Sequence, residues 1–270
     1  MKSELIPFWK FHGTGNDFVV LDNRFSKINL SESQIEDLCR FHTGIGADGL
    51  IMLEEKEGNY RMRYHNSDGR LSSFCGNGSR CFLAFARLMG LVKVAEGLDY
   101  FAADGKHTSR LIHEEGNHWL VETKMEISEL PQQRTQGIIV QTGSPHLLIE
   151  VDERDLASTE FEKIAAEIRY SDAFREMGIN VNWFFNDAGL IRLRTYERGV
   201  ERETLSCGTA AVAAAVWWKQ KYGGPKSKRV NVQTKGGILT ILWDKEEQVW
   251  LRGPVYFTFQ GTWQGFAFRQ

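Results

Sequence analysis

The sequence predicts an α/β protein of two similar halves, each a β-sheet wrapped around one apolar helix. Three observations carry this prediction. Cys75 and Cys207 lie in near-identical settings, 132 residues apart in a chain of 270, so each falls at a matching place in its own half. Each cysteine is followed by Gly, a small polar residue and an apolar run that predicts a helix. Short β-type runs dominate the rest of both halves.

The predicted strands are short runs rich in β-branched and aromatic residues. In the first half they cover 8–11, 18–21, 50–53, 60–64 and 118–122, and in the second half 137–141, 147–151, 181–185, 190–196, 238–243 and 249–252. So many strands with so few helices indicate sheets as the main framework of both halves.

Four helices are predicted, over 31–40, 78–89, 161–168 and 209–221. Ser31 opens the first with the capping-box pattern Ser-Glu-Ser-Gln. Gly90 is placed to end the second, and Gly223-Gly224-Pro225 to end the fourth.

The two halves are predicted to join near 128–132, which gives domains 1–129 and 130–270. A chain of this length has room for two ordinary domains, and it also fits a single large one. The matched cysteine segments favour two domains. The alternative is that the two segments are alike by coincidence, because small residues are common at the start of helices.

Composition narrows the function classes. Hydrophobic residues make up 42% of the chain and charged residues 25%, which is typical of globular proteins. The net charge of −2 gives no electrostatic reason to expect nucleic acid or an anionic membrane as a partner. The longest strongly apolar run, 210–218, is too short to span a bilayer, and no signal peptide is expected. We therefore expect a cytoplasmic protein.

The four cysteines are too few for a disulfide framework, and no pair has the spacing of a zinc site, so no metal is expected. A thiol at a helix N-terminus faces unpaired backbone N–H groups and the positive end of the helix dipole, which in general lowers its pKa to ~3.5–7.5. Cys75 and Cys207 have this placement, whereas Cys39 and Cys81 are expected to be structural. Two such thiols on opposite sides of one substrate suit inversion of a carbon centre.

Seven spaced motifs in order together resemble the diaminopimelate epimerase family over nearly the whole chain. The first four motifs are His12-Gly-x-Gly-Asn-Asp-Phe18, His42-Thr-Gly-Ile-Gly-Ala-Asp-Gly49, Asn66-x-Asp-Gly69 and Cys75-Gly-Asn-Gly-Ser-Arg80. The other three are Gly143-x-Pro-His146, Asn180-Val-Asn182, and Glu197-Arg-Gly199 leading to Cys207-Gly-Thr209.

The resemblance implies interconversion of L,L- and meso-diaminopimelate, in lysine and peptidoglycan precursor biosynthesis, without a cofactor. One cysteine acts as thiolate base and the other as thiol acid; Cys75 and Cys207 match these positions, with His146 supporting the first and Glu197 the second. Two mixed sheets, each around a central helix, with the site in the cleft between them, are also implied. So are a homodimer and a C-terminal tail, about 262–270, that returns to the first half. The substrate-binding positions carried over are Asn16, Asn66, Gly76, Asn77, Asn180, Arg198, Gly208 and Thr209.

The chain departs from the family pattern at several positions. Ser144 stands where the family often has Asn, and Gly49 stands where some members carry a substrate-binding Gln. The segment between Glu197 and Cys207 is one residue longer than usual, and Ala210 replaces a common Gly. These changes bear on substrate fit rather than on the acid and base groups.

Two alternatives remain. A proline or hydroxyproline racemase of the same superfamily commonly has Cys-Gly-His-Gly at the first cysteine, where this chain has Cys75-Gly-Asn-Gly. A protein of another class, a non-enzymatic thiol redox sensor, would not need the four acid and base candidates that the chain retains. A dehydratase relative lacks the second cysteine, and the presence of Cys207 disfavours it.

Overall fold

The computed structural model describes residues 5–72, 74–223 and 227–264. The chain divides into two compact units: unit 1 is Met1–Thr123 with Pro254–Gln270, and unit 2 is Lys124–Gly253. Both division points fall within strands, in β7 (His118–Met125) and β16 (Val249–Gln264). The sequence placed the junction at 129/130 and the returning segment at about 262.

In the described residues of unit 1, eight strands form a closed sheet. β16 pairs with β7 and also with β1, from Leu5↔Gln264 to His12↔Tyr256, so the sheet has no open edge strand. The pairs β2–β3 and β4–β5 are parallel, whereas β1–β2, β1–β16, β3–β4, β5–β6 and β6–β7 are antiparallel. The remaining strands are β1 (Leu5–Gly13), β2 (Asn16–Asp22), β3 (Gly49–Lys56), β4 (Asn59–Asn66), β5 (Gly97–Ala102) and β6 (Gly105–Glu115).

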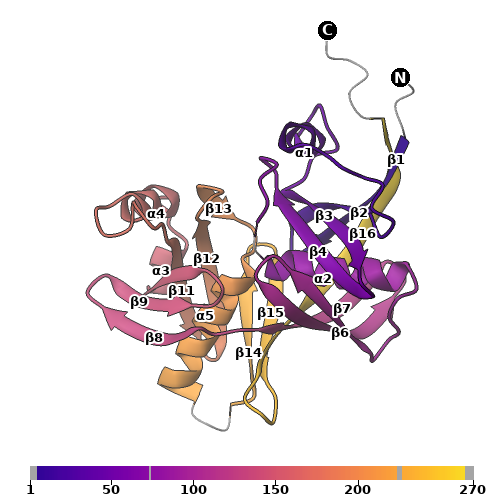
Figure 1. The fold of residues 1–270 in the computed structure, drawn as a ribbon. Helices are drawn as coiled ribbons and strands as arrows, with labels where there is room; N and C mark the ends of the chain where they lie inside the picture. Colours follow the sequence, from indigo (N-terminus) through magenta and orange to yellow (C-terminus); the bar gives the residue numbers. More distant parts are fainter. Residues whose placement is uncertain (1–4, 73, 224–226, 265–270) are drawn as a thin grey trace. The chain divides into compact units, whose positions relative to one another are not determined.

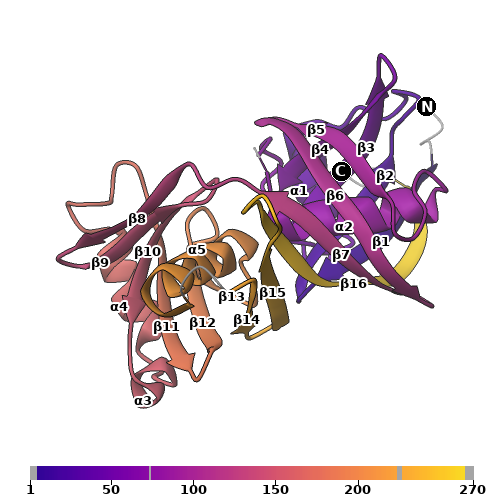
Figure 2. The ribbon, with the colours of Figure 1, turned by 90° about the horizontal axis from the view of Figure 1, so that it is seen from below.

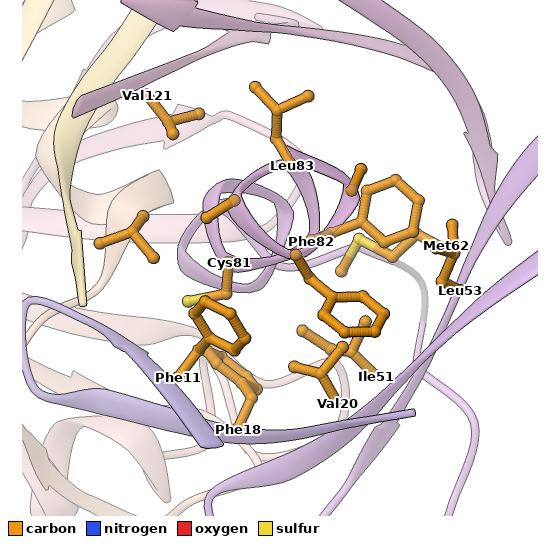
Figure 3. Close-up of a cluster of buried hydrophobic side chains, with 14 of the residues drawn as sticks. Phe11, Phe18, Val20, Ile51, Leu53, Met62, Cys81, Phe82, Leu83 and Val121 are labelled. Carbon is orange, nitrogen blue, oxygen red and sulfur yellow. The ribbon is translucent and has the colours of Figure 1, made fainter. Parts of the chain in front are cut away.

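The helix α2 (Gly76–Leu88) runs inside this sheet (Figure 1). Every residue from Gly76 to Ala86 is buried, as expected for a helix enclosed on all sides. Phe82 and Phe85 pack against aromatic and aliphatic side chains from the surrounding strands, a cluster drawn in Figure 3. Burial of this apolar surface is the main force that holds the sheet around the helix.

A chain of buried hydroxyl groups fixes the first turn of α2. Ser79 donates to the carbonyl of Gly76 (2.9 Å) and contacts Thr123 Oγ1 (2.9 Å). Thr123 in turn contacts Ser109 (2.9 Å), which contacts the hydroxyl of Tyr100 (3.0 Å). A fully bonded buried network of this kind is rigid, so the residue that precedes the helix is held in place.

Unit 2 has a mixed sheet packed around α5 (Gly208–Trp218), visible in Figure 2. The strand order is β8-β9-β10-β11-β12-β14-β15, with β13 on β12 and the start of β16 on β15. The pairs β10–β11 and β12–β14 are parallel. The strands are β8 (Glu129–Arg134), β9 (Gly137–Gln141), β10 (Pro145–Glu150), β11 (Asn180–Asp187), β12 (Leu190–Glu197), β13 (Arg202–Thr204), β14 (Arg229–Thr234) and β15 (Gly237–Trp243).

The two units share one order of elements. In unit 1 a hairpin (β1–β2) is followed by α1 (Glu32–Cys39), a strand pair (β3–β4), the central helix α2 and then β5–β6. Unit 2 repeats this with β9–β10, the short helices α3 (Glu153–Leu156) and α4 (Phe161–Arg169), β11–β12, α5 and β14–β15. Each helical segment joins two parallel strands, the connection that parallel pairing requires. The predicted fold of two sheets around central helices is confirmed.

Several local predictions are confirmed and others were wrong. Ser31 caps α1 with a complete capping box, and Gly90 follows α2 with φ +78°. The predicted junction at 128–132 overlaps the start of β8, which occupies 129–134. α5 ends at Trp218 and continues as a π-helical turn, Lys219–Gly223; Gly224 and Pro225 lie outside the described residues.

The described residues contain neither a membrane-spanning helix nor a cluster of metal ligands. In that part of the chain, no helix is long and apolar enough to cross a membrane. Across the same residues, no group of three or more His, Cys, Asp or Glu side chains is arranged to hold a metal ion. None of the four cysteines, all of them described, is disulfide-bonded.

Candidate active site

Cys75 is the N-cap residue of α2. Its backbone is extended (φ −133°, ψ 117°), and Sγ accepts a hydrogen bond from the Gly78 amide at 3.3 Å. A cap residue satisfies one of the amide groups that the first helical turn leaves without a partner. The half-buried thiol is therefore held against the positive end of a helix whose first turn is itself rigid.

Asn16 contacts this thiol and is itself held by two further side chains. Asn16 Oδ1 lies 3.8 Å from Cys75 Sγ and accepts from Asn77 Nδ2 at 3.2 Å. The Asn16 amide donates in the other direction to Asp48 Oδ2 at 2.7 Å. Since an ionised carboxylate only accepts, Asp48 fixes which end of Asn16 faces the thiol. The structure thus brings together Asn16, Cys75, Gly76 and Asn77; their role in binding a substrate stays a prediction.

Asn66 lies at the end of β4, next to Gly49 in the pairing of β3 with β4. It is exposed, and its backbone accepts from Gly69 (2.9 Å) and donates to Arg70 (3.0 Å) in a tight turn. Its role in binding a substrate stays a prediction.

Cys207 occupies the corresponding position in unit 2, as N-cap of α5 with φ −122° and ψ 115°. It is 6% exposed, and its Sγ lies 3.3 Å from the hydroxyl of Thr209 in the first turn. Thr142 donates to the carbonyl of Thr209 at 3.0 Å, which ties this turn to the segment before β10. Cys207, Gly208 and Thr209 are thus held as one rigid group.

His146 lies behind Thr209, fully buried. Its Nε2 is 2.9 Å from Thr209 Oγ1, and its Nδ1 is 3.3 Å from Asn182 Nδ2. Burial lowers the pKa of His146 to about 3, and the charge of Arg198 adds to this effect. The ring is therefore neutral at physiological pH. These contacts connect His146 with Cys207, in its own unit; its expected support of Cys75 stays a prediction.

Glu197 ends β12 and accepts a hydrogen bond from Thr204 Oγ1 at 3.0 Å, across the short pairing of β12 with β13. The lengthened segment between Glu197 and Cys207 forms this hairpin. It turns at Gly199 (φ +88°) and Glu201 (φ +56°). The extra length is thus accommodated before β13, and Glu197 keeps a partner in unit 2.

Asn180 differs from expectation in how its side chain is used. Its amide donates to Ser144 Oγ (2.8 Å) and to the carbonyl of Pro145 (2.9 Å), while its Oδ1 accepts from the Arg198 backbone amide (2.9 Å). Both amide hydrogens are therefore engaged within the protein. Asn180 positions Arg198, and Ser144 takes part in this contact in place of the longer side chain common in the family.

The side chain of Arg198 is exposed and donates from Nη1 to the carbonyl of Met177 at 3.0 Å. The neighbouring carboxylates have other partners: Glu201 pairs with Arg169, and Glu203 with Arg194 and Lys235. Within the described residues Arg198 forms no ion pair, so a role in a surface salt bridge is not what the structure shows.

Sequence reasoning missed three residues of these two groups. Asp48, Arg80 and Asn182 lie within the seven motifs, but the sequence alone predicted no role for any of them. The signal that could have found them is chemical: each is a polar residue inside a motif that is otherwise buried or glycine-rich. Chemically, each group presents a thiol at a helix N-terminus, where anions and thiolates are stabilised.

The chain is similar in sequence to proteins of one named family. The family model described as diaminopimelate epimerase matches residues 8–124 and 138–258. A curated diaminopimelate epimerase from Flavobacterium psychrophilum is 36% identical over 95% of this chain and 100% of its own length. One from Aquifex aeolicus is also 36% identical, over 95% of this chain and 97% of its own.

Solved structures of lower identity share the fold. A PhzF-family phenazine biosynthesis protein of Bacillus anthracis superposes with a TM-score of 0.72 at 14% identity, covering 96% of this chain and 99% of its own. A hydroxyproline epimerase of Agrobacterium vitis gives 0.69 at 15% identity, covering 98% and 94%. The motif order, the repeated topology with its two N-cap thiols, and the identity to named relatives agree: this chain belongs to the diaminopimelate epimerase family.

Proposed function

We propose that this protein interconverts L,L- and meso-diaminopimelate by an acid/base mechanism that uses Cys75 and Cys207 and no cofactor, in lysine and peptidoglycan precursor biosynthesis. In this proposal the two thiols act on opposite faces of one α-carbon. We also propose a cytoplasmic homodimer, for which a measurement of mass by sedimentation is the test.

The observation that carries this proposal is the matched position of the two thiols in a repeated topology. Each caps the central helix of its unit, with closely similar backbone angles, and follows the fourth strand of the repeat, with the short strand β13 intervening in unit 2. Epimerisation needs two equivalent groups that exchange roles when the reaction runs backwards. Two copies of one structural unit, each with its own N-cap thiol, supply such a pair.

The chemistry balances with these two groups alone. One cysteine, as thiolate, takes the α-proton and becomes a thiol, leaving the electron pair on the α-carbon. The other cysteine, as thiol, delivers its proton to the opposite face and becomes a thiolate. The product has the inverted centre. The protein returns to its starting state when the newly formed thiol loses a proton to solvent and the newly formed thiolate takes one up.

The α-proton is weakly acidic, so the protein must stabilise the developing negative charge. Preorganised N–H groups and dipoles are the main means of doing this in a buried site. The first turns of α2 and α5, at Gly76-Asn77 and Gly208-Thr209, offer such groups and suit the reacting α-carboxylate. Both turns are fixed by side-chain hydrogen bonds, so little reorganisation is needed during the reaction.

The far end of diaminopimelate distinguishes it from simpler amino acids. Arg198, which has no carboxylate partner among the described residues, matches a distal carboxylate through the planar fork of its guanidinium. Asn180 contributes by holding the Arg198 backbone, and Asn66 is retained as a contact for the distal amino acid group. Proline and hydroxyproline lack this distal group and would leave Arg198 unused.

The experiment that tests the function is α-proton exchange in deuterated water, followed by mass spectrometry. Diaminopimelate, proline and hydroxyproline are compared as substrates at equal concentration. We expect rapid exchange and epimerisation of diaminopimelate only. Exchange of proline or hydroxyproline at a similar rate would instead support the proline-type alternative, and no exchange with any substrate would favour the redox-sensor alternative.

A further inference from the structure

Arg80 is a fully buried arginine inside α2, five residues after the proposed acid/base thiol. Its guanidinium donates to the Gly76 carbonyl (3.1 Å), to Asn77 Oδ1 (2.9 Å) and to Thr14 Oγ1 (3.5 Å), and its Nε has no partner. All of these acceptors are neutral, and within the described residues Arg80 has no carboxylate partner. A buried charge without a counter-charge is costly, so its retention here requires an explanation.

The protein is built to accommodate this guanidinium. A Cβ at Gly13 would lie 3.1 Å from Arg80 Nη2 and 3.7 Å from Cζ, so only glycine leaves ordinary contact distance there. Thr14 follows with a left-handed backbone (φ +51°) and is 2% exposed. The turn between β1 and β2 is thus shaped around the end of the Arg80 side chain.

Burial lowers the pKa of Arg80 to about 10, and the nearby thiols of Cys81 and Cys75 act in the opposite direction. The guanidinium therefore remains charged at neutral pH. Cys81 cannot serve as its counter-charge, because full burial raises the pKa of that thiol far above the physiological range. Cys75, half-buried at the helix terminus, is the thiol near Arg80 that can ionise.

Arg80 is also connected to Cys75 through side-chain amides. It donates to Asn77, Asn77 donates to Asn16 Oδ1, and the same oxygen faces Cys75 Sγ. Because a guanidinium only donates, Arg80 fixes the orientation of the Asn77 amide, as Asp48 fixes that of Asn16. The amide chain runs from a buried cation to a carboxylate, with the thiol beside its middle.

At Cys75 the neutral hydrogen bonds oppose each other. Asn16 Oδ1 accepts from the thiol and favours its protonated form, whereas the Gly78 amide donates to sulfur and favours the thiolate. Nearby charge then shifts the balance between the two forms. In the interior, where screening is weak, an uncompensated cation has a larger effect than in water.

We propose that Arg80 is a positioning residue for the reaction: its uncompensated buried charge favours the Cys75 thiolate, and its hydrogen bonds set the amides that face the thiol. This inference deepens the proposed function and rests on it for its role in turnover. Other charged or titratable groups lie around this end of α2. They are Lys10 and Asp17, which form an ion pair, Asp48, whose pKa burial raises, and His12, whose pKa burial lowers.

The test measures ionisation of Cys75 directly and needs no substrate. In a Cys207→Ser background, the rate of Cys75 alkylation by iodoacetamide is followed by mass spectrometry from pH 5.5 to 9.5. We expect Arg80→Met to slow alkylation about tenfold at pH 7, equivalent to one pH unit, with rates that converge with the parent at high pH. Arg80→Lys, which keeps the charge, should stay closer to the parent than Arg80→Met.

A merely structural role predicts a different result: unfolding at lower temperature, with either an unchanged alkylation profile or an equal change at every pH. Either profile would overturn the proposal. Because alkylation is independent of turnover, a shifted profile together with no exchange of diaminopimelate would count against the proposed function and leave the role of Arg80 supported.

A second pair of variants covers the case in which Arg80→Met does not fold. Thr14→Asp places a carboxylate beside Arg80 Nη2, and Thr14→Asn is its uncharged control of the same shape. Both residue types tolerate a left-handed backbone. We expect alkylation of Cys75 at pH 7 to be several-fold slower in Thr14→Asp than in Thr14→Asn. Equal rates would contradict the proposal.

Discussion

The imidazole of His146 donates from Nε2 to the hydroxyl of Thr209 over 2.9 Å. The direction of this hydrogen bond follows from the other side of the ring, where Asn182 Nδ2 faces His146 Nδ1. Asn182 Nδ2 also lies within bonding distance of two backbone carbonyls, which identifies it as the amide nitrogen, a donor. With Nδ1 as acceptor, Nε2 carries the proton. The Thr209 hydroxyl can then donate to Cys207 Sγ, 3.3 Å away, and stabilise its thiolate.

The first prediction concerns this connection. Thr209→Val keeps the shape of the side chain but removes the hydroxyl, leaving His146 Nε2 and Cys207 Sγ without their shared partner. Loss of a buried hydrogen-bond partner costs about 1–3 kcal/mol, so we expect kcat/KM for diaminopimelate to fall roughly 5- to 100-fold. Thr209→Ser, which retains the hydroxyl, is the matched control and should stay near wild type. Equal activities of the two variants would contradict the connection.

The second prediction is a pH dependence of stability due to His146. Its folded-state pKa of about 3 lies below the ordinary value of 6.5, so the unfolded chain binds a proton more readily. The stability from the neutral ring is therefore complete above pH 6.5 and is lost progressively as the pH falls toward 3. Urea unfolding of wild type between pH 7 and 4 should show this loss.

A His146→Gln variant has no group that titrates in this range at position 146. We expect it to be less stable than wild type at pH 7 and to lose less stability on acidification to pH 4. His12 and His65, whose pKa values burial also lowers, titrate in both proteins and cancel in the comparison. Parallel pH curves for the two proteins would show that His146 is not the buried neutral group described.

The third prediction concerns substrate choice. Arg198→Lys keeps the positive charge but loses the bidentate grip on a distal carboxylate. A charge-assisted hydrogen bond contributes about 1.5–3 kcal/mol, so kcat/KM for diaminopimelate should fall roughly ten- to hundredfold. Arg192→Lys is the control, because Arg192 pairs with Glu153 at the surface (2.5 Å), where an ion pair has little effect. Similar activity of both variants would remove Arg198 from the proposed site.

The fourth prediction concerns oxidation. If both thiols act on one α-carbon, they approach closely, and a mild oxidant should join Cys75 to Cys207 when their Cα atoms come within ~4.4–6.8 Å. Activity should fall on oxidation and return with a thiol reductant. Peptide mapping should find the 75–207 crosslink and no Cys39 adduct, because burial raises the pKa of Cys39 to about 12. A Cys39–Cys81 bond, or no crosslink, would count against the proposed approach of the two thiols.

The sequence predicted those parts of the fold that local chemistry determines. The Ser31 capping box, the stop at Gly90 and the N-cap positions of Cys75 and Cys207 depend on a few adjacent residues and a helix that follows. Strands β5, β6, β8, β13 and β14 were missed. β6 is largely polar, so its pattern is weak, whereas β14 does alternate between buried and exposed residues and could have been found.

The contacts of the candidate site required the fold itself. Asp48 reaches Asn16 from 32 residues away, and His146 reaches Thr209 from 63. Such distances in sequence are closed only by strand pairing and by the central helices, which no local pattern specifies. For the same reason the motif that contains Arg80 was visible in the sequence, while its burial without a carboxylate partner was not.

The central claim is that one thiol serves each face of the substrate. Its most direct test measures deuterium incorporation and inversion at the α-carbon of diaminopimelate in deuterated water, for wild type, Cys75→Ser and Cys207→Ser. A serine hydroxyl is a far weaker acid than a thiol, so its alkoxide is hardly available as a base. The account predicts that wild type inverts the centre with uptake of solvent deuterium, and that each variant loses most of the inversion. Near-normal inversion by either variant would contradict it.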